Sequence, residues 1–182
     1  MDEQHIARIV EQVVARLGSG APAVLRHARG EQIGGQGVHP DVDSAVSAAR
    51  RAYDDLRGMT LSQRGALIQA LRDTTRDVLE TISRMAVDET GLGRYDDKLA
   101  KNTLVLEKTP GTEALQPRAE SGDHGLTLTE YAPFGVIGSI TPCTNPTETI
   151  LNNGIGMLAA GNAVVFNTHP TAKRTSAFFI DA

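Results

Sequence analysis

The sequence is poor in cysteine and in aromatic residues: it has one cysteine, no tryptophan, three tyrosines and four phenylalanines. A single cysteine cannot form a disulfide within the chain, which fits a reducing compartment such as the cytosol. No cluster of cysteine and histidine has the spacing of a structural zinc site, so we expect no bound metal.

The sequence also lacks a block of basic residues and a long apolar run. The net charge is −4, and this argues against a surface that binds nucleic acid. No apolar segment approaches the roughly 20 residues that a membrane-spanning helix needs. The 182 residues have the composition of a globular protein and the length of one domain, or of one domain with an appendage.

Residues 1–17 form a predicted amphipathic helix. Its apolar side chains recur at helical spacing and make one stripe: Ile6, Ile9, Val10, Val13, Val14 and Leu17. Residues 18–40 are rich in glycine and show no sustained periodicity, which predicts a flexible linker. Because a short helix is marginal alone in water, this helix either folds back on its own domain or docks on a partner.

Three further helices are expected before the first strand. Residues 41–56 repeat the amphipathic pattern, and Thr60 and Gln63 form a capping box that opens a long helix ending at Gly91. A third helix is predicted near residues 95–107; its segment DDKLAKN is mostly charged and is interpreted as a solvated face. Residues 112–124 are predicted to be a loop.

The second half of the chain alternates strands and helices. LTLTEYAP (126–133) has the alternation of a strand, and GVIGSIT (135–141) and AVVF (163–166) have the apolar character of buried strands. Asn145 and Pro146 open a helix that ends at Gly161, and another helix follows Pro170. This order predicts an α/β fold with parallel strands. The last segment leaves Phe178 to Ile180 without a partner, so we expect a truncated chain.

Gly154 to Ala159 match the glycine-rich fingerprint of dinucleotide-binding proteins. That fingerprint binds a pyrophosphate only where it follows a strand and opens a helix, whereas here it falls inside a predicted helix. Small residues at this place favour close packing of the helix against a sheet. We therefore do not expect a phosphate site at these glycines.

Three polar residues stand at predicted strand ends, where α/β folds bind ligands. Cys143 is a possible nucleophile, although free cysteines are usually inert. Asn145 either caps the following helix or donates its amide to an oxyanion. His169 is a base, a contact to phosphate or adenosine, or a loop residue. The spacing of the sequence does not separate these alternatives.

The stretch YAPFGVIGSITPCTNPTETILNNGIGMLAAGNAVVFNTHPTAK closely resembles the CoA-acylating aldehyde dehydrogenases of bacterial microcompartments, which act on propionaldehyde or acetaldehyde. DETGLGRYDDKLAKN and KTPGTEAL upstream are similar to the same family. The resemblance implies that residues 41–182 are the N-terminal part of an NAD-binding domain, an incomplete aldehyde-dehydrogenase-like α/β domain with leading helices. It implies that residues 1–17 are an encapsulation peptide binding a shell protein, inside a cytoplasmic microcompartment. It also implies a homo-oligomer at full length.

In this family a cysteine thiolate attacks the aldehyde, hydride passes to NAD, and coenzyme A releases the acyl group. The resemblance places one segment beside the nicotinamide ribose: Ile140, Thr141, Pro142, Cys143 and Thr144. It places a second segment at the adenosine: Asn167, Thr168, His169 and Pro170. Asn145 matches the amide that steadies the hemithioacetal oxygen, although an ungapped register puts Thr144 there. Asn167 stands where non-acylating relatives have a ribose-binding lysine.

The family's nucleophile lies in a later domain, beyond the end of this sequence, and Cys143 occupies a position that commonly holds serine. The chain alone is therefore expected to be inactive. The alternative is a cargo adaptor or a non-catalytic remnant of such an enzyme. The length of the aldehyde and the choice between NAD and NADP stay open.

Overall fold

A computed structural model describes residues 35–182 of the chain. The predicted helix 1–17 and most of the predicted linker 18–40 lie outside the described residues. Within the described range, no helix combines the length and the apolar composition that crossing a membrane requires. The same residues contain no group of histidine, cysteine or carboxylate side chains arranged to hold a metal ion.

Three helices lead the fold: α3 (Val42–Arg57), α4 (Leu61–Thr90) and α5 (Tyr95–Lys108). The predicted capping box is confirmed, because the Gln63 amide donates to Thr60 Oγ1 over 3.2 Å and the Thr60 amide donates to Gln63 Oε1 over 2.9 Å. Gly91 ends α4 in a left-handed conformation with φ of 68°, which glycine adopts without strain. At the start of α3, the Ser44 amide bonds the Asp41 carboxylate and lowers the pKa of that group.

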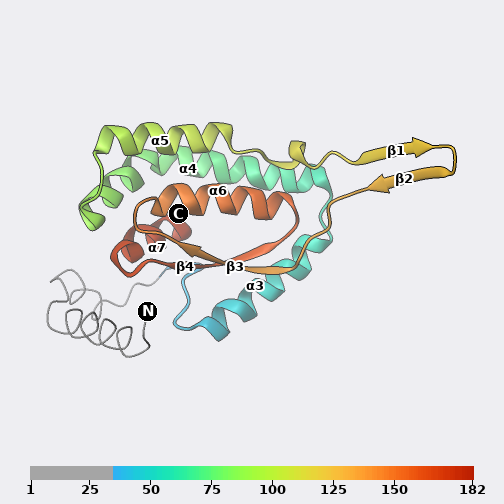
Figure 1. The fold of residues 1–182 in the computed structure, drawn as a ribbon. Coiled ribbons are helices and arrows are strands. Elements are labelled where there is room, and N and C mark those ends of the chain that lie inside the picture. Colours follow the sequence, from blue (N-terminus) through green and yellow to red (C-terminus); the bar gives the residue numbers. More distant parts are fainter. Residues whose placement is uncertain (1–34) are drawn as a thin grey trace, which may run out of the picture. The chain divides into compact units, whose positions relative to one another are not determined.

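The predicted parallel unit is confirmed. Strands β3 (Val136–Thr141) and β4 (Ala163–Thr168) pair in parallel, and α6 (Pro146–Ala159) connects them. α6 lies between these strands and α4 and α5, while α3 lies on the opposite side of the strands (Figure 1). A 3₁₀ turn and α7 (Lys173–Asp181) follow β4. The core is apolar and joins α4, α5 and α6: Ile68, Leu106, Leu151, Ile155 and Ala159.

The prediction that β3 is buried is wrong for one of its faces. Ser139 points at α6, where its hydroxyl accepts a hydrogen bond of 3.0 Å from Asn153 Nδ2. On the other face Ile140 is 82% exposed, and its strand partner Asn167 is exposed too. The two strands are thus half-buried, because α3 covers that face only in part.

The predicted loop 112–124 is also wrong in its second half. It holds a 3₁₀ turn (Thr112–Ala114) and then β1 (Arg118–Gly122), which pairs antiparallel with β2 (Gly125–Thr129). All residues of this hairpin are exposed, and it extends away from the helices in Figure 1. β1 contains mostly polar and small residues, so no apolar alternation marked it as a strand.

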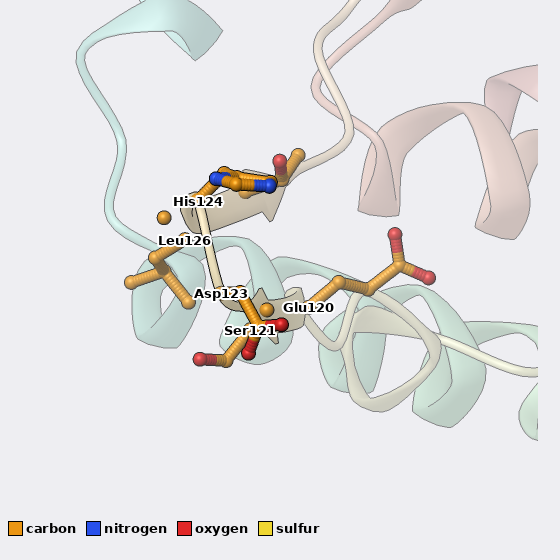
Figure 2. Close-up of a pocket in the computed structure, with 8 residues that line it drawn as sticks. Glu120, Ser121, Asp123, His124 and Leu126 are labelled. Atoms are coloured by element: carbon orange, nitrogen blue, oxygen red, sulfur yellow. The ribbon is translucent and has the colours of Figure 1, made fainter.

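A hollow of about 430 Å³ lies at the tip of this hairpin, lined by residues 120–127. Figure 2 shows the side chains of Glu120, Ser121, Asp123, His124 and Leu126 around it. Its walls are one consecutive and fully exposed segment, so it is the concave side of a turn. It is distant in the fold from the strand ends where α/β proteins bind ligands.

The last residues of the predicted linker belong to the fold. The Val38 amide bonds the Gly35 carbonyl over 3.2 Å, which closes a turn, and the Gln36 amide bonds the Asp181 carboxylate at the end of α7. A Cβ atom added at Gly35 would meet Asp181 at 2.8 Å. The backbone of this turn therefore packs directly on α7.

The start of β3 depends on one buried side chain, that of Asn162. Its Oδ1 accepts hydrogen bonds from the backbone amides of Phe134, over 2.6 Å, and Gly135, over 3.0 Å. Asn162 itself is only 3% exposed. One amide oxygen thus accepts hydrogen bonds from the two backbone amides that immediately precede β3.

We predict that Asn162→Ala lowers the free energy of unfolding by about 2 kcal/mol, because two backbone donors lose their acceptor. Urea unfolding of the 182-residue chain measures this. Asn167→Ala is the control, since Asn167 is exposed on β4, and it should change stability by less than about 0.5 kcal/mol. Equal stabilities of the two variants would contradict the role given to Asn162.

Candidate functional site

The ends of β3 and β4 bring together the two segments predicted to bind the cofactor. In the parallel register, Ile140 pairs with Asn167 and Thr141 pairs with Thr168. Both strands therefore end at one edge, and the residues that follow each strand start from neighbouring points. This carboxyl edge is where α/β folds bind nucleotides.

The edge combines an open face with a buried one. Ile140 and Asn167 offer an apolar side chain and a neutral amide to solvent on the face away from α6. Thr141 is 2% exposed on the other face, and its Oγ1 has no hydrogen-bond partner in the described part of the chain. Pro142 and Thr144 are exposed, and Cys143 is a free, half-buried thiol.

His169 acts locally at the end of β4. Its Nδ1 accepts a hydrogen bond of 3.2 Å from the Thr171 amide and lies 2.8 Å from Thr171 Oγ1, so it caps the 3₁₀ turn Pro170–Ala172. The structure thus shows a local role in the turn, and the predicted contact to adenosine stays a prediction. Because Nδ1 is an acceptor here, the neutral ring carries its proton on Nε2.

The glycines of the fingerprint-like run lie inside α6, as the sequence indicates. Gly154 is buried, and a Cβ atom added there would meet the Phe166 ring of β4 at 3.9 Å. That distance is an ordinary van der Waals contact, so the packing of helix against strand does not by itself require glycine here. Since α6 already begins at Pro146, the backbone amides of Gly154 and Gly156 are engaged within the helix and cannot meet a pyrophosphate.

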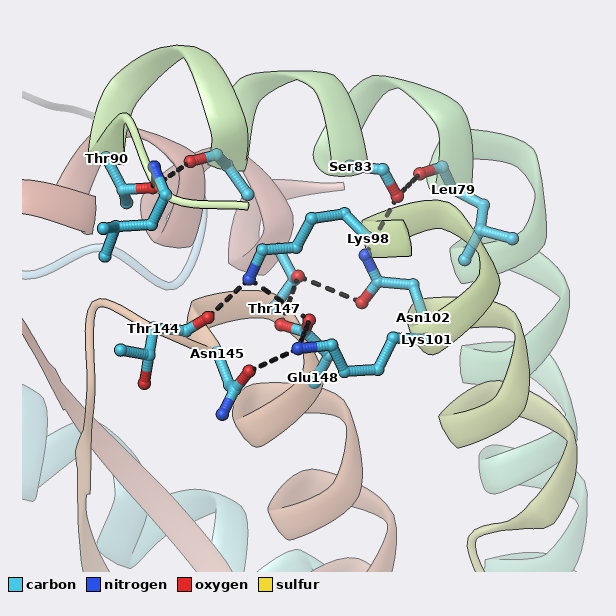
Figure 3. Close-up of polar contacts among 12 residues, drawn as sticks. Leu79, Ser83, Thr90, Lys98, Lys101, Asn102, Thr144, Asn145, Thr147 and Glu148 are labelled. Carbon is cyan, nitrogen blue, oxygen red and sulfur yellow. Dashed lines mark hydrogen bonds and ion pairs between the residues drawn. The ribbon is translucent and has the colours of Figure 1, made fainter. Parts of the chain in front are cut away.

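Asn145 does not use its side chain to cap α6, so that interpretation is wrong. It occupies the N-cap position, but no hydrogen bond runs from the helix to its side chain. Its Oδ1 instead accepts a hydrogen bond of 2.7 Å from Lys101 Nζ of α5 (Figure 3). The Asn145 side chain is thus held by α5 and not by α6, the helix that it precedes.

A second lysine of α5 holds the same loop from a buried position. Lys98 is 3% exposed, and its Nζ donates to the Thr144 carbonyl and lies 3.4 Å from Glu148 Oε1. Lys101 Nζ also lies 3.4 Å from that carboxylate oxygen. The prediction that DDKLAKN is a solvated face is therefore wrong for Lys98 and Asn102, which face the interior.

The remaining polar side chains of this network have buried neighbours within hydrogen-bond distance, and the single Thr147 hydroxyl proton is shared between two acceptors. Thr147 Oγ1 lies 3.0 Å from Asn102 Oδ1 and 3.1 Å from Glu148 Oε2. Asn102 Nδ2 donates to Ser83 Oγ over 2.9 Å. The chain of contacts runs from α4 through α5 to the first turn of α6, as Figure 3 shows.

Residues 22–182 match the aldehyde dehydrogenase family. The chain belongs to that family. The predicted resemblance to its CoA-acylating members is confirmed by the relatives: the chain is 44% identical over 178 residues to an acetaldehyde dehydrogenase (acetylating) of Bilophila wadsworthia. That match covers 96% of this chain and 36% of the relative, so the chain spans about a third of the relative's length.

Two solved structures share the fold. An engineered glycolyl-CoA reductase with bound NADP+ is 52% identical with a TM-score of 0.77, over 83% of this chain and 34% of that one. A propionaldehyde dehydrogenase from the fucose utilisation microcompartment of Clostridium phytofermentans is 55% identical with a TM-score of 0.75, over 79% of this chain and 33% of that one. The predicted α/β fold of this aldehyde dehydrogenase family is thus confirmed.

Three residues of the site in this aldehyde dehydrogenase chain were not predicted from the sequence: Lys98, Lys101 and Glu148. The signal was present only in part. The two lysines stand three residues apart and so share one face of a helix, and Glu148 stands in the first turn of another. Nothing in the spacing shows that these helices meet, since 50 residues separate Lys98 from Glu148.

We predict that Lys98→Met lowers the free energy of unfolding by about 3 kcal/mol, because it leaves the Thr144 carbonyl without its lysine donor and removes one of the two lysine charges beside the buried Glu148 carboxylate. Adding Glu148→Leu should cost less than the sum of the two single changes. Urea unfolding measures both, with the exposed Lys108→Met at the end of α5 as control. A Lys98→Met chain as stable as that control would contradict the prediction.

Proposed function

We propose that this chain is the N-terminal part of an enzyme that oxidises a short-chain aldehyde to an acyl-CoA, with NAD and coenzyme A. The relatives named as acetylating and as a glycolyl-CoA reductase support the reaction class. The chain spans about a third of those relatives, and we propose that the cysteine nucleophile of the complete enzyme is a residue other than Cys143. The observation that carries the proposal is the Asn145 amide, held beside the open carboxyl edge of β3 and β4.

The edge fits a nicotinamide dinucleotide. Ile140 offers apolar surface and Asn167 offers an amide on the same open face. An apolar surface suits the nicotinamide ring, and an amide suits the hydroxyl groups of a ribose. We propose that Ile140 to Thr144 line the nicotinamide ribose and that Asn167 to Pro170 line the adenosine. NAD held there would supply the hydride acceptor, and coenzyme A would supply the thiol that takes the acyl group from the enzyme thioester. We propose NAD, with NADP as the alternative that the glycolyl-CoA reductase supports.

The proposed role of Asn145 is electrostatic. When the thiolate of the nucleophile adds to the aldehyde carbon, the carbonyl π electrons move onto oxygen and leave a hemithioacetal oxyanion. An amide N–H aimed at that oxygen stabilises the charge before hydride departs. Cys143 has no part in the covalent step under this proposal.

We predict that the 182-residue chain alone produces no NADH from propionaldehyde, NAD and coenzyme A, and that Cys143→Ser leaves kcat of the complete enzyme within about 2-fold of wild type. Absorbance at the NADH band measures both. NADH formation by the isolated chain, at a rate abolished by Cys143→Ser, would show that this cysteine is the nucleophile.

The second proposed function is docking to a shell. One similar structure comes from a microcompartment, and residues 1–17 have an apolar stripe that suits a helix-binding groove. We propose that this segment recruits the enzyme to a shell protein, within the cytoplasm. Oligomerisation of the complete enzyme stays a prediction; the exposed Leu126 and Leu128 of the hairpin are candidate contacts.

We predict that deleting residues 1–17 abolishes co-sedimentation of the enzyme with assembled shells and leaves its activity intact. Val13→Glu, on the apolar stripe, should act like the deletion, because it places a charge in the docking face. Gln12→Glu adds the same charge on the polar side and should retain binding. Unchanged shell association after the deletion would rule out this function.

A further inference from the structure

The contact with Lys101 fixes which way the Asn145 amide faces. A lysine ammonium has three donors and no acceptor, so only the carbonyl oxygen of the amide can face it. Lys101 Nζ accordingly lies 2.7 Å from Asn145 Oδ1. Asn145 Nδ2 points away from the lysine in Figure 3 and has no hydrogen-bond partner within residues 35–182. Both of its N–H groups are therefore available to a ligand.

Lys101 is itself held in place. Its ammonium is 3.4 Å from Glu148 Oε1, and the Glu148 side chain is only 6% exposed. The same oxygen lies 3.4 Å from Lys98 Nζ, which also binds the Thr144 carbonyl. Two lysines on one face of α5 thus fix consecutive residues of the loop, one through its backbone and the other through its side chain.

We propose that Lys101 is a positioning residue for the oxidation of the aldehyde, acting through Asn145. It excludes the amide orientation that would aim Oδ1 at the oxyanion and repel it. Its charge on Oδ1 also polarises the amide, which makes the N–H groups at Nδ2 stronger donors. This inference rests on the proposed function, because it needs Asn145 to face the hemithioacetal oxygen.

The same geometry separates Asn145 from Thr144 as the oxyanion donor. The backbone of Thr144 is bound to Lys98, and its side chain is exposed to solvent, with no hydrogen bond to orient it among residues 35–182. Asn145 is half-buried, with one end of its side chain fixed. A preorganised donor is worth more than a freely rotating one, so the structure assigns the role to Asn145.

The test compares variants of the complete enzyme by steady-state kinetics. Lys101→Met should lower kcat about 10- to 100-fold and change KM for propionaldehyde less than about 3-fold, because the lost interaction acts on the transition state. Lys101→Arg should recover kcat to within about 5-fold, since a guanidinium also only donates. Lys108→Met, on the same helix and exposed, should match wild type.

A double substitution distinguishes positioning from a general loss of structure. Asn145→Ala should lower kcat about 100-fold, as for other oxyanion donors. Adding Lys101→Met to it should lower kcat by less than about 2-fold more, because the amide that the lysine positions is gone. If Lys101→Met does not fold, judged by its thermal melt, Lys101→Gln replaces it and should lower kcat about 5- to 10-fold, because glutamine carries an acceptor as well as donors and no longer fixes the orientation of the Asn145 amide.

Each outcome has a distinct meaning. Wild-type kcat in Lys101→Met, or in Lys101→Gln where that replaces it, together with impaired Asn145→Ala, would overturn the positioning role and leave the function intact. Additive losses in the double variant would also overturn it. Wild-type kcat in Asn145→Ala would instead refute the oxyanion assignment in the proposed function, and a large loss in Thr144→Val would move that role to Thr144.

Discussion

The buried contact of Lys98 with Glu148 is the interaction on which the placement of the loop at residues 144–145 depends. Removing two charges from water is costly, and the mutual attraction repays that cost only if further hydrogen bonds satisfy both groups. Here the Thr144 carbonyl accepts from the lysine, and the Thr147 hydroxyl lies 3.1 Å from the carboxylate. The carboxylate also sits in the first turn of α6, where the helix dipole favours negative charge.

This network connects the helical half of the chain to the strand half. α5 supplies the two lysines, and β3 leads directly into the loop that they hold. α6 then carries the chain back to β4, whose register sets Ile140 beside Asn167. The amide of Asn145 therefore lies close to the open edge, because the loop that carries it directly follows β3 and is held by the two lysines of α5.

Features of the fold that depend on neighbouring residues could be predicted from the sequence. The capping box at Thr60, the glycine at the end of α4 and the proline at the start of α6 each act within one helical turn, and all are confirmed. The position of Gly154 inside a helix followed from Pro146 eight residues earlier. The resemblance supplied the family and the two segments at the carboxyl edge, which the parallel register brings together.

Features that depend on distant partners could not be predicted. In the sequence Lys98 has the pattern of a surface residue, and its burial depends on the contact with Glu148 of another helix. Asn145 has the sequence of a helix cap, and only α5 diverts its side chain. Ile140 lies in an apolar strand, yet its exposure depends on how far α3 extends over the sheet. In each of these cases the local pattern permits more than one outcome, and tertiary contacts decide between them.

A crystal structure of the complete enzyme with its nucleophile acylated tests the central claim most directly. The account predicts that Asn145 Nδ2 lies about 3 Å from the thioester oxygen while Oδ1 still accepts from Lys101. A structure in which the Asn145 side chain has left Lys101, or in which the Thr144 hydroxyl bonds that oxygen instead, would contradict it.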